Sequence, residues 1–276
     1  MNAKPVALIT GATSGIGQAT AYRLHDRGYT VFATGRNPEA LDALRAKGLQ
    51  ARSLDVTDES AASLVIEEIQ AEHGGVDVLV NSAGYPLPRP LEQVALDELR
   101  ALFETNVVAT LHLSQAVLPG MRARRSGTIV TIGSTGGRFT SPGAGAYHTV
   151  KYAVEALSLS LGAEVAQFGV RVVLIDPTGV RTPFVSSQFD TVHSYPDDDP
   201  YGEFKIRYSE TTRRLATTPG ATVDADTVAR AVVRAIKAKN PRPRYIVGAS
   251  GKASVLARAL LSDRMWDRVM STGLKG

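Results

Sequence analysis

Short apolar runs alternate with longer amphipathic stretches along most of the chain. The runs VALIT, VDVLV, TIVTI and VRVVLI are apolar at successive positions, which is typical of strands that are buried on both faces of a sheet. The stretches between them repeat apolar residues at helical spacing. This alternation predicts βαβ units and a parallel sheet with helices on both faces.

The same pattern sets the expected bounds of each element. Strands are expected at Pro5–Thr10, Thr30–Thr34, Gln50–Leu54, Val76–Asn81, Gly127–Ile132, Val170–Ile175 and Arg244–Val247. Helices are expected at Gly15–Arg27, Pro38–Ala46, Asp58–Glu72, Leu96–Pro119 (broken or bent), Met121–Arg125, Tyr147–Gln167 and Thr227–Ala238. The expected fold class is α/β, with a doubly wound parallel sheet of about seven strands in a single Rossmann-type domain over residues 1–276.

Two segments lie outside this repeating pattern. Residues 182–222 are rich in Ser, Thr, Pro and Asp, and we interpret them as a lid inserted at the substrate site, because long loops in compact domains are usually functional or disordered. Residues 250–274 carry apolar residues at helical spacing with Lys and Arg between them, which predicts a C-terminal amphipathic helix. We expect this helix to pack on its own fold or on a partner subunit, and peripheral membrane contact is the second interpretation.

Composition and charge exclude several function classes. The chain has no Cys and five widely spaced His, so we expect no disulfide, no thiol nucleophile and no metal site. A net charge of +4 with only 6% aromatic residues argues against nucleic-acid binding. No apolar run approaches the roughly 18 residues of a membrane span, and no signal sequence precedes the first strand, so a cytoplasmic location is expected.

A glycine-rich turn, TGATSGIG, joins the first predicted strand to the first helix. Its first glycine permits a tight turn, its second lets the backbone approach a pyrophosphate, and its third lets the helix pack closely on the strand. Bound phosphates would then lie at a helix N-terminus, where unpaired N–H groups and the helix dipole favour negative charge. The turn therefore predicts a dinucleotide site at Gly11, Thr13, Ser14, Gly15, Ile16 and Gly17.

The end of the second predicted strand indicates which nicotinamide cofactor is bound. An acidic residue at this point would hydrogen-bond the ribose 2′-hydroxyl of NAD, whereas an Arg would bind the 2′-phosphate of NADP. The sequence has Gly35 at the acidic position and Arg36 directly after it. Because a guanidinium matches the geometry of a phosphate, we expect NADP(H) to be preferred.

Tyr147, Lys151 and Ser134 form the candidate chemical centre. Tyr147 and Lys151 are four residues apart in a predicted helix, so they lie on one face, and Ser134 follows the fifth predicted strand. Reduction of a carbonyl requires a hydride on carbon and a proton on oxygen. We expect Tyr147 to be the general acid, Lys151 to lower its pKa, and Ser134 to polarise the carbonyl. His148 follows Tyr147 directly, so its side chain is expected to point elsewhere, and no role is assigned to it.

These motifs together resemble those of the short-chain dehydrogenase/reductase family over about Pro5–Thr182. The resemblance implies that Lys151 also binds the nicotinamide ribose and that Asn106 holds a water that connects Lys151 to solvent. It implies adenine contacts at Asp55 and Val56, and it implies a sheet segment beside the cofactor at Asn81, Ala83 and Gly84. Contacts with the nicotinamide end are implied for Pro177, Val180 and Thr182.

The resemblance also implies a homodimer or homotetramer, formed through the helices near Leu96–Pro119 and Tyr147–Gln167. The tail is similar, more loosely, to that of extended members of the family that act on steroids, retinoids and related lipidic alcohols. We therefore expect an NADPH-dependent reductase, acting reversibly on a hydrophobic ketone or aldehyde. Two alternatives stay open, a non-redox epimerase or dehydratase with bound nicotinamide, and an NADPH-binding sensor.

Overall fold

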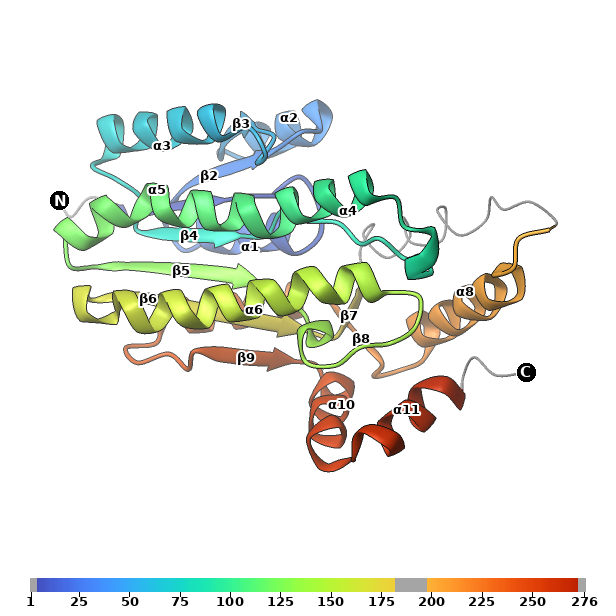
Figure 1. Ribbon diagram of the computed structural model, residues 1–276. Coiled ribbons are helices and arrows are strands. Elements are labelled where there is room, and N and C mark those ends of the chain that lie inside the picture. Colours follow the sequence, from blue (N-terminus) through green and yellow to red (C-terminus); the bar gives the residue numbers. More distant parts are fainter. Residues whose placement is uncertain (1–3, 182–197, 273–276) are drawn as a thin grey trace.

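A computed structural model describes residues 4–181 and 198–272 of the chain (Figure 1). Seven parallel strands form the main sheet, in the order β3-β2-β1-β4-β5-β6-β9. Their bounds are β1 (Val6–Ile9), β2 (Thr30–Gly35), β3 (Gln50–Ser53), β4 (Val78–Asn81), β5 (Gly127–Ile132), β6 (Val170–Pro177) and β9 (Arg244–Val247). The seven parallel strands predicted from the sequence are therefore confirmed.

Helices cover both faces of this sheet and bury a separate apolar core on each. One core contains apolar residues of α1 (Gly15–His25), α2 (Pro38–Ala46) and α9 (Ala225–Lys237). The other contains residues of α3 (Glu59–His73), α5 (Ala109–Ala123) and α6 (Gly145–Val165). Strand order reverses between β1 and β4, and in such sheets ligands bind beyond the carboxyl ends of the strands at this reversal.

The long helix expected over Leu96–Pro119 contains a change of helix type. It consists of α4 (Leu96–Phe103), a π turn at Glu104–Val108, and α5. The prediction of a separate helix at Met121–Arg125 is wrong, because α5 continues through Pro119 to Ala123. Met121 is fully buried in the core, and its packing offsets the loss of the backbone hydrogen bond that Pro119 cannot donate.

Two small strands enclose the inserted segment. β7 (Gly179–Arg181) pairs in parallel with β8 (Thr222–Asp224). Arg181 reinforces the pair through Asp224 Oδ1, 2.5 Å from its Nη2, and through the Thr222 hydroxyl. Within the segment, α8 covers Gly202–Thr217, where the sequence predicts only a lid.

The tail forms two helices, so the prediction of one helix over residues 250–274 is wrong. α10 (Ala249–Leu260) and α11 (Asp263–Thr272) are separated at Leu261, whose backbone is extended. The bend lets Trp266 turn inward, where it is 6% exposed and its ring centroid lies 5.4 Å from that of Phe139. Burial of this large ring provides a physical reason for the break.

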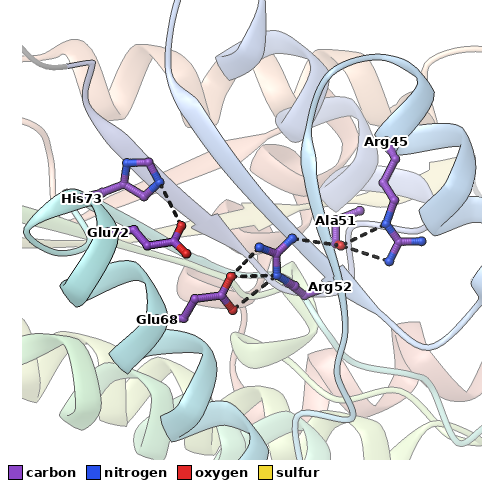
Figure 2. Close-up of polar contacts among 6 residues, drawn as sticks. All are labelled: Arg45, Ala51, Arg52, Glu68, Glu72 and His73. Atoms are coloured by element: carbon purple, nitrogen blue, oxygen red, sulfur yellow. Dashed lines mark hydrogen bonds and ion pairs between the residues drawn. The ribbon is translucent and has the colours of Figure 1, made fainter.

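Charged side chains protect the outer edge of the sheet at β3 (Figure 2). The Arg45 guanidinium donates two hydrogen bonds to the Ala51 carbonyl, at 3.2 and 3.1 Å. Arg52 forms an ion pair with Glu68 of α3, and its guanidinium lies 5.5 Å from the centroid of the Phe32 ring. Charges on an edge strand discourage pairing with a second chain.

Candidate active site

A cavity of about 470 Å³ opens beyond the carboxyl ends of β1, β2, β4, β5 and β6. This volume lies within the range of small-molecule and cofactor sites. Most of the residues predicted from the sequence line it: Gly11, Thr13, Ser14, Gly15, Ile16, Arg36, Asp55, Val56, Ala83, Gly84, Ser134, Tyr147, Lys151, Pro177 and Val180. Gly17, Asn81 and Asn106 lie behind this lining, and Thr182 falls outside the described residues.

The glycine turn is packed too closely to accept side chains. Gly11 has φ +62°, and a Cβ there would lie 2.8 Å from Ala83 Cα. A Cβ at Gly17 would overlap the carbonyl oxygen of Gly11. Ser14 precedes α1 and makes no side-chain capping bond, and Ser14, Gly15 and Ile16 all line the cavity, so the first N–H groups of α1 lie at its wall. This arrangement suits an anionic ligand group.

Arg36 and Asp55 lie together at one end of the cavity. The Arg36 side chain is 77% exposed, and its Nη1 is 3.4 Å from Asp55 Oδ2. The backbone N–H of Thr57 holds the pKa of Asp55 below its usual value, with a smaller contribution from Arg36. Most of the guanidinium therefore remains accessible beside a fixed carboxylate.

Ser134, Tyr147 and Lys151 meet at the other end of the cavity. Tyr147 and Lys151 are one turn apart on α6, and Lys151 Nζ lies 5.6 Å from the centroid of the Tyr147 ring. The Ser134 side chain hydrogen-bonds that of Tyr147. Lys151 Nζ donates to the carbonyl of Ile132, at 3.1 Å. The structure thus brings together the three side chains that the sequence selects.

Burial dominates the ionisation of this centre. It raises the pKa of Tyr147 to about 12, against the opposing effect of the Ser134 hydrogen bond, and the charge of Asp176 adds to the rise. Burial also lowers the pKa of Lys151 to about 8, and Asp176 opposes this shift. The lowered pKa that we predicted for Tyr147 is therefore not found in this structure, because burial of the phenol outweighs its favourable contacts.

A buried carboxylate lies behind the Ser134 turn and was missed by sequence analysis. Asp176, at the end of β6, is 1% exposed, and a Cβ at Gly133 would overlap its Oδ1. Arg244 Nε lies 3.3 Å from its Oδ2, while Arg244 and Arg138 both bind Glu155. Burial raises the pKa of Asp176 to about 7, and Glu155 adds to the rise. No local sequence motif marks this cluster, whose members come from four separate segments.

Asn106 lies in the π turn and is 2% exposed. Its Nδ2 donates to the carbonyl of Leu102 at 3.1 Å, and a Cβ at Gly84 would lie 2.6 Å from its Oδ1. Asn81 is likewise buried and donates to Ser114 Oγ at 3.2 Å. Both amides brace the wall of the cavity from behind.

Helix α8 contributes a wall of the cavity that sequence analysis did not specify, through Thr212, Leu215 and Ala216. Phe204 and Tyr208 of the same helix pack against Gly143, where a Cβ would lie 3.2 and 2.6 Å from their rings. A helical signal was available, because Phe204, Tyr208, Thr212 and Leu215 are spaced by four, four and three residues.

The sheet, the glycine turn and the Ser–Tyr–Lys centre define a dinucleotide-dependent oxidoreductase fold. Residues 5–193 match the family model of the short chain dehydrogenases, and the chain belongs to that family. It is 33% identical over 278 residues to an NADPH-dependent 3-dehydrocapnine reductase of Ornithobacterium rhinotracheale, with 98% of this chain and 97% of that protein covered.

Solved structures are similar over nearly the whole chain. A short-chain dehydrogenase from Streptomyces avermitilis has a TM-score of 0.81 and 34% identity, and the match covers 100% of both chains. A variant of the actinorhodin polyketide ketoreductase with NADPH has a TM-score of 0.75 and 30% identity, over 90% of this chain and 97% of that one. In the described part of this chain, no helix has the length and apolar character needed to cross a membrane.

Proposed function

We propose that this protein reduces a hydrophobic ketone or aldehyde to the alcohol with NADPH, and that it catalyses the reverse oxidation. The observation that carries the proposal is that one cavity has the glycine turn, which suits phosphate groups, at one end and Ser134, Tyr147 and Lys151 at the other. Family membership supports the reaction class. The NADPH in the names of both the reductase and the ketoreductase supports the cofactor.

The residues of the cavity suit NADP(H). Gly11 and Gly15 have φ of +62° and +54° and line the cavity without side chains, so a pyrophosphate can approach the backbone of the turn. Arg36 would pair with the 2′-phosphate, and Asp55 and Val56 would contact the adenine. Pro177, Val180 and Thr182 would hold the nicotinamide end. When bound, the reduced cofactor supplies the hydride.

The protein's own groups supply the proton and hold the carbonyl. The Ser134 hydroxyl donates a hydrogen bond to the substrate oxygen, which favours negative charge on it. Tyr147 then gives its phenolic proton to that oxygen, and the Lys151 ammonium stabilises the phenolate that remains. Asn106, in the π turn, is the proposed holder of a water that connects Lys151 to solvent. Lys151 would also bind the nicotinamide ribose.

The proposed substrate is apolar near its carbonyl. Leu215 and Ala216 of α8 and Val180 of β7 are apolar residues that line the cavity. The two named relatives are a reductase of 3-dehydrocapnine and a polyketide ketoreductase. Both names describe reductases, which supports a carbonyl substrate for this chain.

We propose a homodimer or homotetramer as the assembly. Leu96 of α4 and Tyr152 of α6 are 66% and 43% exposed on the two helices that the family resemblance assigns to the interface. Large apolar side chains at such exposure are typical of contact surfaces when they gather on one face.

The test measures NADPH oxidation against hydrophobic ketones, quinones, steroids, retinal and medium-chain aldehydes, with NADH in parallel. Tyr147→Phe is expected to abolish turnover. Tyr152→Phe is the matched control, because Tyr152 is a half-exposed tyrosine five residues further along the same helix. Tight NADPH binding without turnover of any carbonyl, or a Tyr147→Phe protein as fast as the wild type, would contradict the proposal.

A further inference from the structure

His148 follows Tyr147 on α6 and is 5% exposed, with its imidazole directed at the turn that carries Ser134. Its Nδ1 lies 2.7 Å from the carbonyl oxygen of Gly136. Its Nε2 lies 3.1 Å from the backbone nitrogen of Ser141 and 2.9 Å from the Ser141 hydroxyl. Both ring nitrogens therefore bind the same loop, one near its beginning and one near its end.

The partners of the ring fix its protonation state. A carbonyl oxygen only accepts a hydrogen bond, so Nδ1 carries the proton that Gly136 receives. The backbone nitrogen of Ser141 only donates, so Nε2 is an unprotonated acceptor. The ring is accordingly neutral. Burial lowers the pKa of His148, against the opposing effect of its bond to Gly136.

A chain of donors leads from this ring to the reacting groups. The N–H of Gly136 donates to Ser134 Oγ at 3.0 Å. That oxygen accepts from the backbone, so the proton of the Ser134 hydroxyl stays available for another partner, and the side chain hydrogen-bonds that of Tyr147. A Cβ at Gly136 would lie 2.9 Å from His148 Nδ1 and 3.3 Å from Ser134 Oγ, so the glycine is held closely between them.

The elements packed around His148 offer no ionic partner among the described residues. The rings of Phe139 and Tyr147 lie 6.3 and 6.2 Å from its own, centroid to centroid. Phe139 in turn contacts Trp266 of α11. Within the described part of the chain, burial lowers the pKa of His148 and the hydrogen bond to the Gly136 carbonyl raises it. Protonation of the His148 ring would therefore affect the site by changing its hydrogen bonds to the loop, rather than by acting on a neighbouring charge.

We propose that His148 is a positioning residue, whose neutral imidazole holds the Ser134 turn so that the serine hydroxyl donates toward the carbonyl. The inference rests on the proposed reductase function. A second proton on the ring would place an N–H on Nε2 opposite the N–H of Ser141, and these two donors cannot pair, which leaves the Ser141 hydroxyl as the acceptor at this end of the loop. Acid would therefore remove one of the bonds that hold the loop and lower kcat.

The first experiment is independent of activity. Spectra of the protein labelled with ¹⁵N-histidine report the tautomer of each ring, and comparison with His148→Asn assigns the signal of His148. We expect the Nδ1–H tautomer, with a protonation midpoint below that of an exposed histidine. A signal from the Nε2–H tautomer, or from a charged ring at neutral pH, would overturn the proposal whatever the enzyme's substrate.

The second experiment is a double-mutant cycle on kcat. His148→Phe keeps the ring volume and removes both hydrogen bonds, and kcat is expected to fall about 10- to 100-fold, as for other small misplacements of catalytic groups. In a Ser134→Ala background the same change is expected to have little further effect. His148→Asn, whose amide N–H can still reach Gly136, is expected to recover part of kcat and to lose the acid limb of the pH profile.

Binding measurements separate this role from damage to the fold. The Kd for NADPH is expected to be unchanged in His148→Phe, because the glycine turn and Arg36 lie at the other end of the cavity. The proposal would be overturned if His148→Phe lowered kcat equally in the wild type and in Ser134→Ala, or if His148→Asn kept the acid limb of the pH profile. If the wild type itself turned over no carbonyl, the proposed function would fail. The tautomer measurement would still test whether the His148 ring is neutral and bound to the loop as proposed.

Discussion

Replacement of Asp176 by Asn is expected to change how stability depends on pH. Burial raises the pKa of this carboxyl from 3.8 to about 7. The folded protein thus binds the proton more tightly than the unfolded chain does. The carboxyl therefore contributes stability that is fully present below about pH 4 and is lost as the pH rises through 7.

The size of the effect follows from the shift. About 3 pKa units at about 1.4 kcal/mol each amount to about 4 kcal/mol of unfolding free energy lost between about pH 4 and pH 8. Asparagine is neutral at every pH. Asp176→Asn should therefore equal the wild type in stability near pH 4 and exceed it by up to about 4 kcal/mol near pH 8.

Urea unfolding followed by circular dichroism at several pH values measures both proteins. Glu155→Gln is the matched control. It removes a charge from the same cluster, and because Glu155 raises the pKa of Asp176, it should move the loss of stability to lower pH. A stability difference between Asp176→Asn and wild type that stayed constant with pH would refute the reasoning. A variant that was less stable than the wild type at high pH would also refute the reasoning, because this result would mean that Arg244 stabilises the ionised carboxylate of Asp176.

Three further predictions concern the cofactor and the fold. Arg36→Ala should weaken NADPH binding about 10-fold or more, by loss of a charge-assisted phosphate contact, and leave NADH binding unchanged in parallel titrations; equal losses for both would count against the role of Arg36. Gly17→Ala should lower the free energy of unfolding by about 1–3 kcal/mol through overpacking and raise the Kd for NADPH, because its Cβ would overlap Gly11. An unchanged unfolding midpoint and an unchanged affinity would contradict this prediction. Trp266→Ala should lower the free energy of unfolding by about 3–5 kcal/mol, because the ring is buried against Phe139. Limited proteolysis should then cleave within α10 and α11 before it cleaves the sheet, and a tail that stayed protected would argue against this prediction.

The sheet and the residues around the cavity were predictable because their signals are local. A strand buried on both faces, such as β5, is a continuous apolar run in the sequence, and both β5 and β9 begin and end where the sequence places them. Gly11, Ser134 and Tyr147 follow short motifs whose spacing has a direct geometric meaning. Fold topology then brings them to one edge of the sheet.

The rest depends on contacts between distant segments. The continuation of α5 through Pro119 relies on burial of Met121, and the break at Leu261 relies on the contact of Trp266 with Phe139. Asp176 follows an apolar strand in the sequence, and only the approach of Arg244 and Glu155 reveals a charged cluster. His148 was set aside because it is adjacent to Tyr147, although that adjacency turns its ring toward the loop of Ser134. The expectations of a cytoplasmic location and of one domain over residues 1–276 stay predictions.

The pairing of β7 with β8 has a consequence for the length of the segment between them. The chain leaves β7 at Arg181 and returns beside this strand at Thr222. The ends of the intervening segment are thus fixed together whatever its length, and each doubling of a flexible connection adds only about 0.6 kcal/mol of closure entropy. Insertions and deletions between these two points are therefore inexpensive. The wall of the cavity that α8 provides can therefore change with the length of this segment, while the sheet and the glycine turn stay as they are.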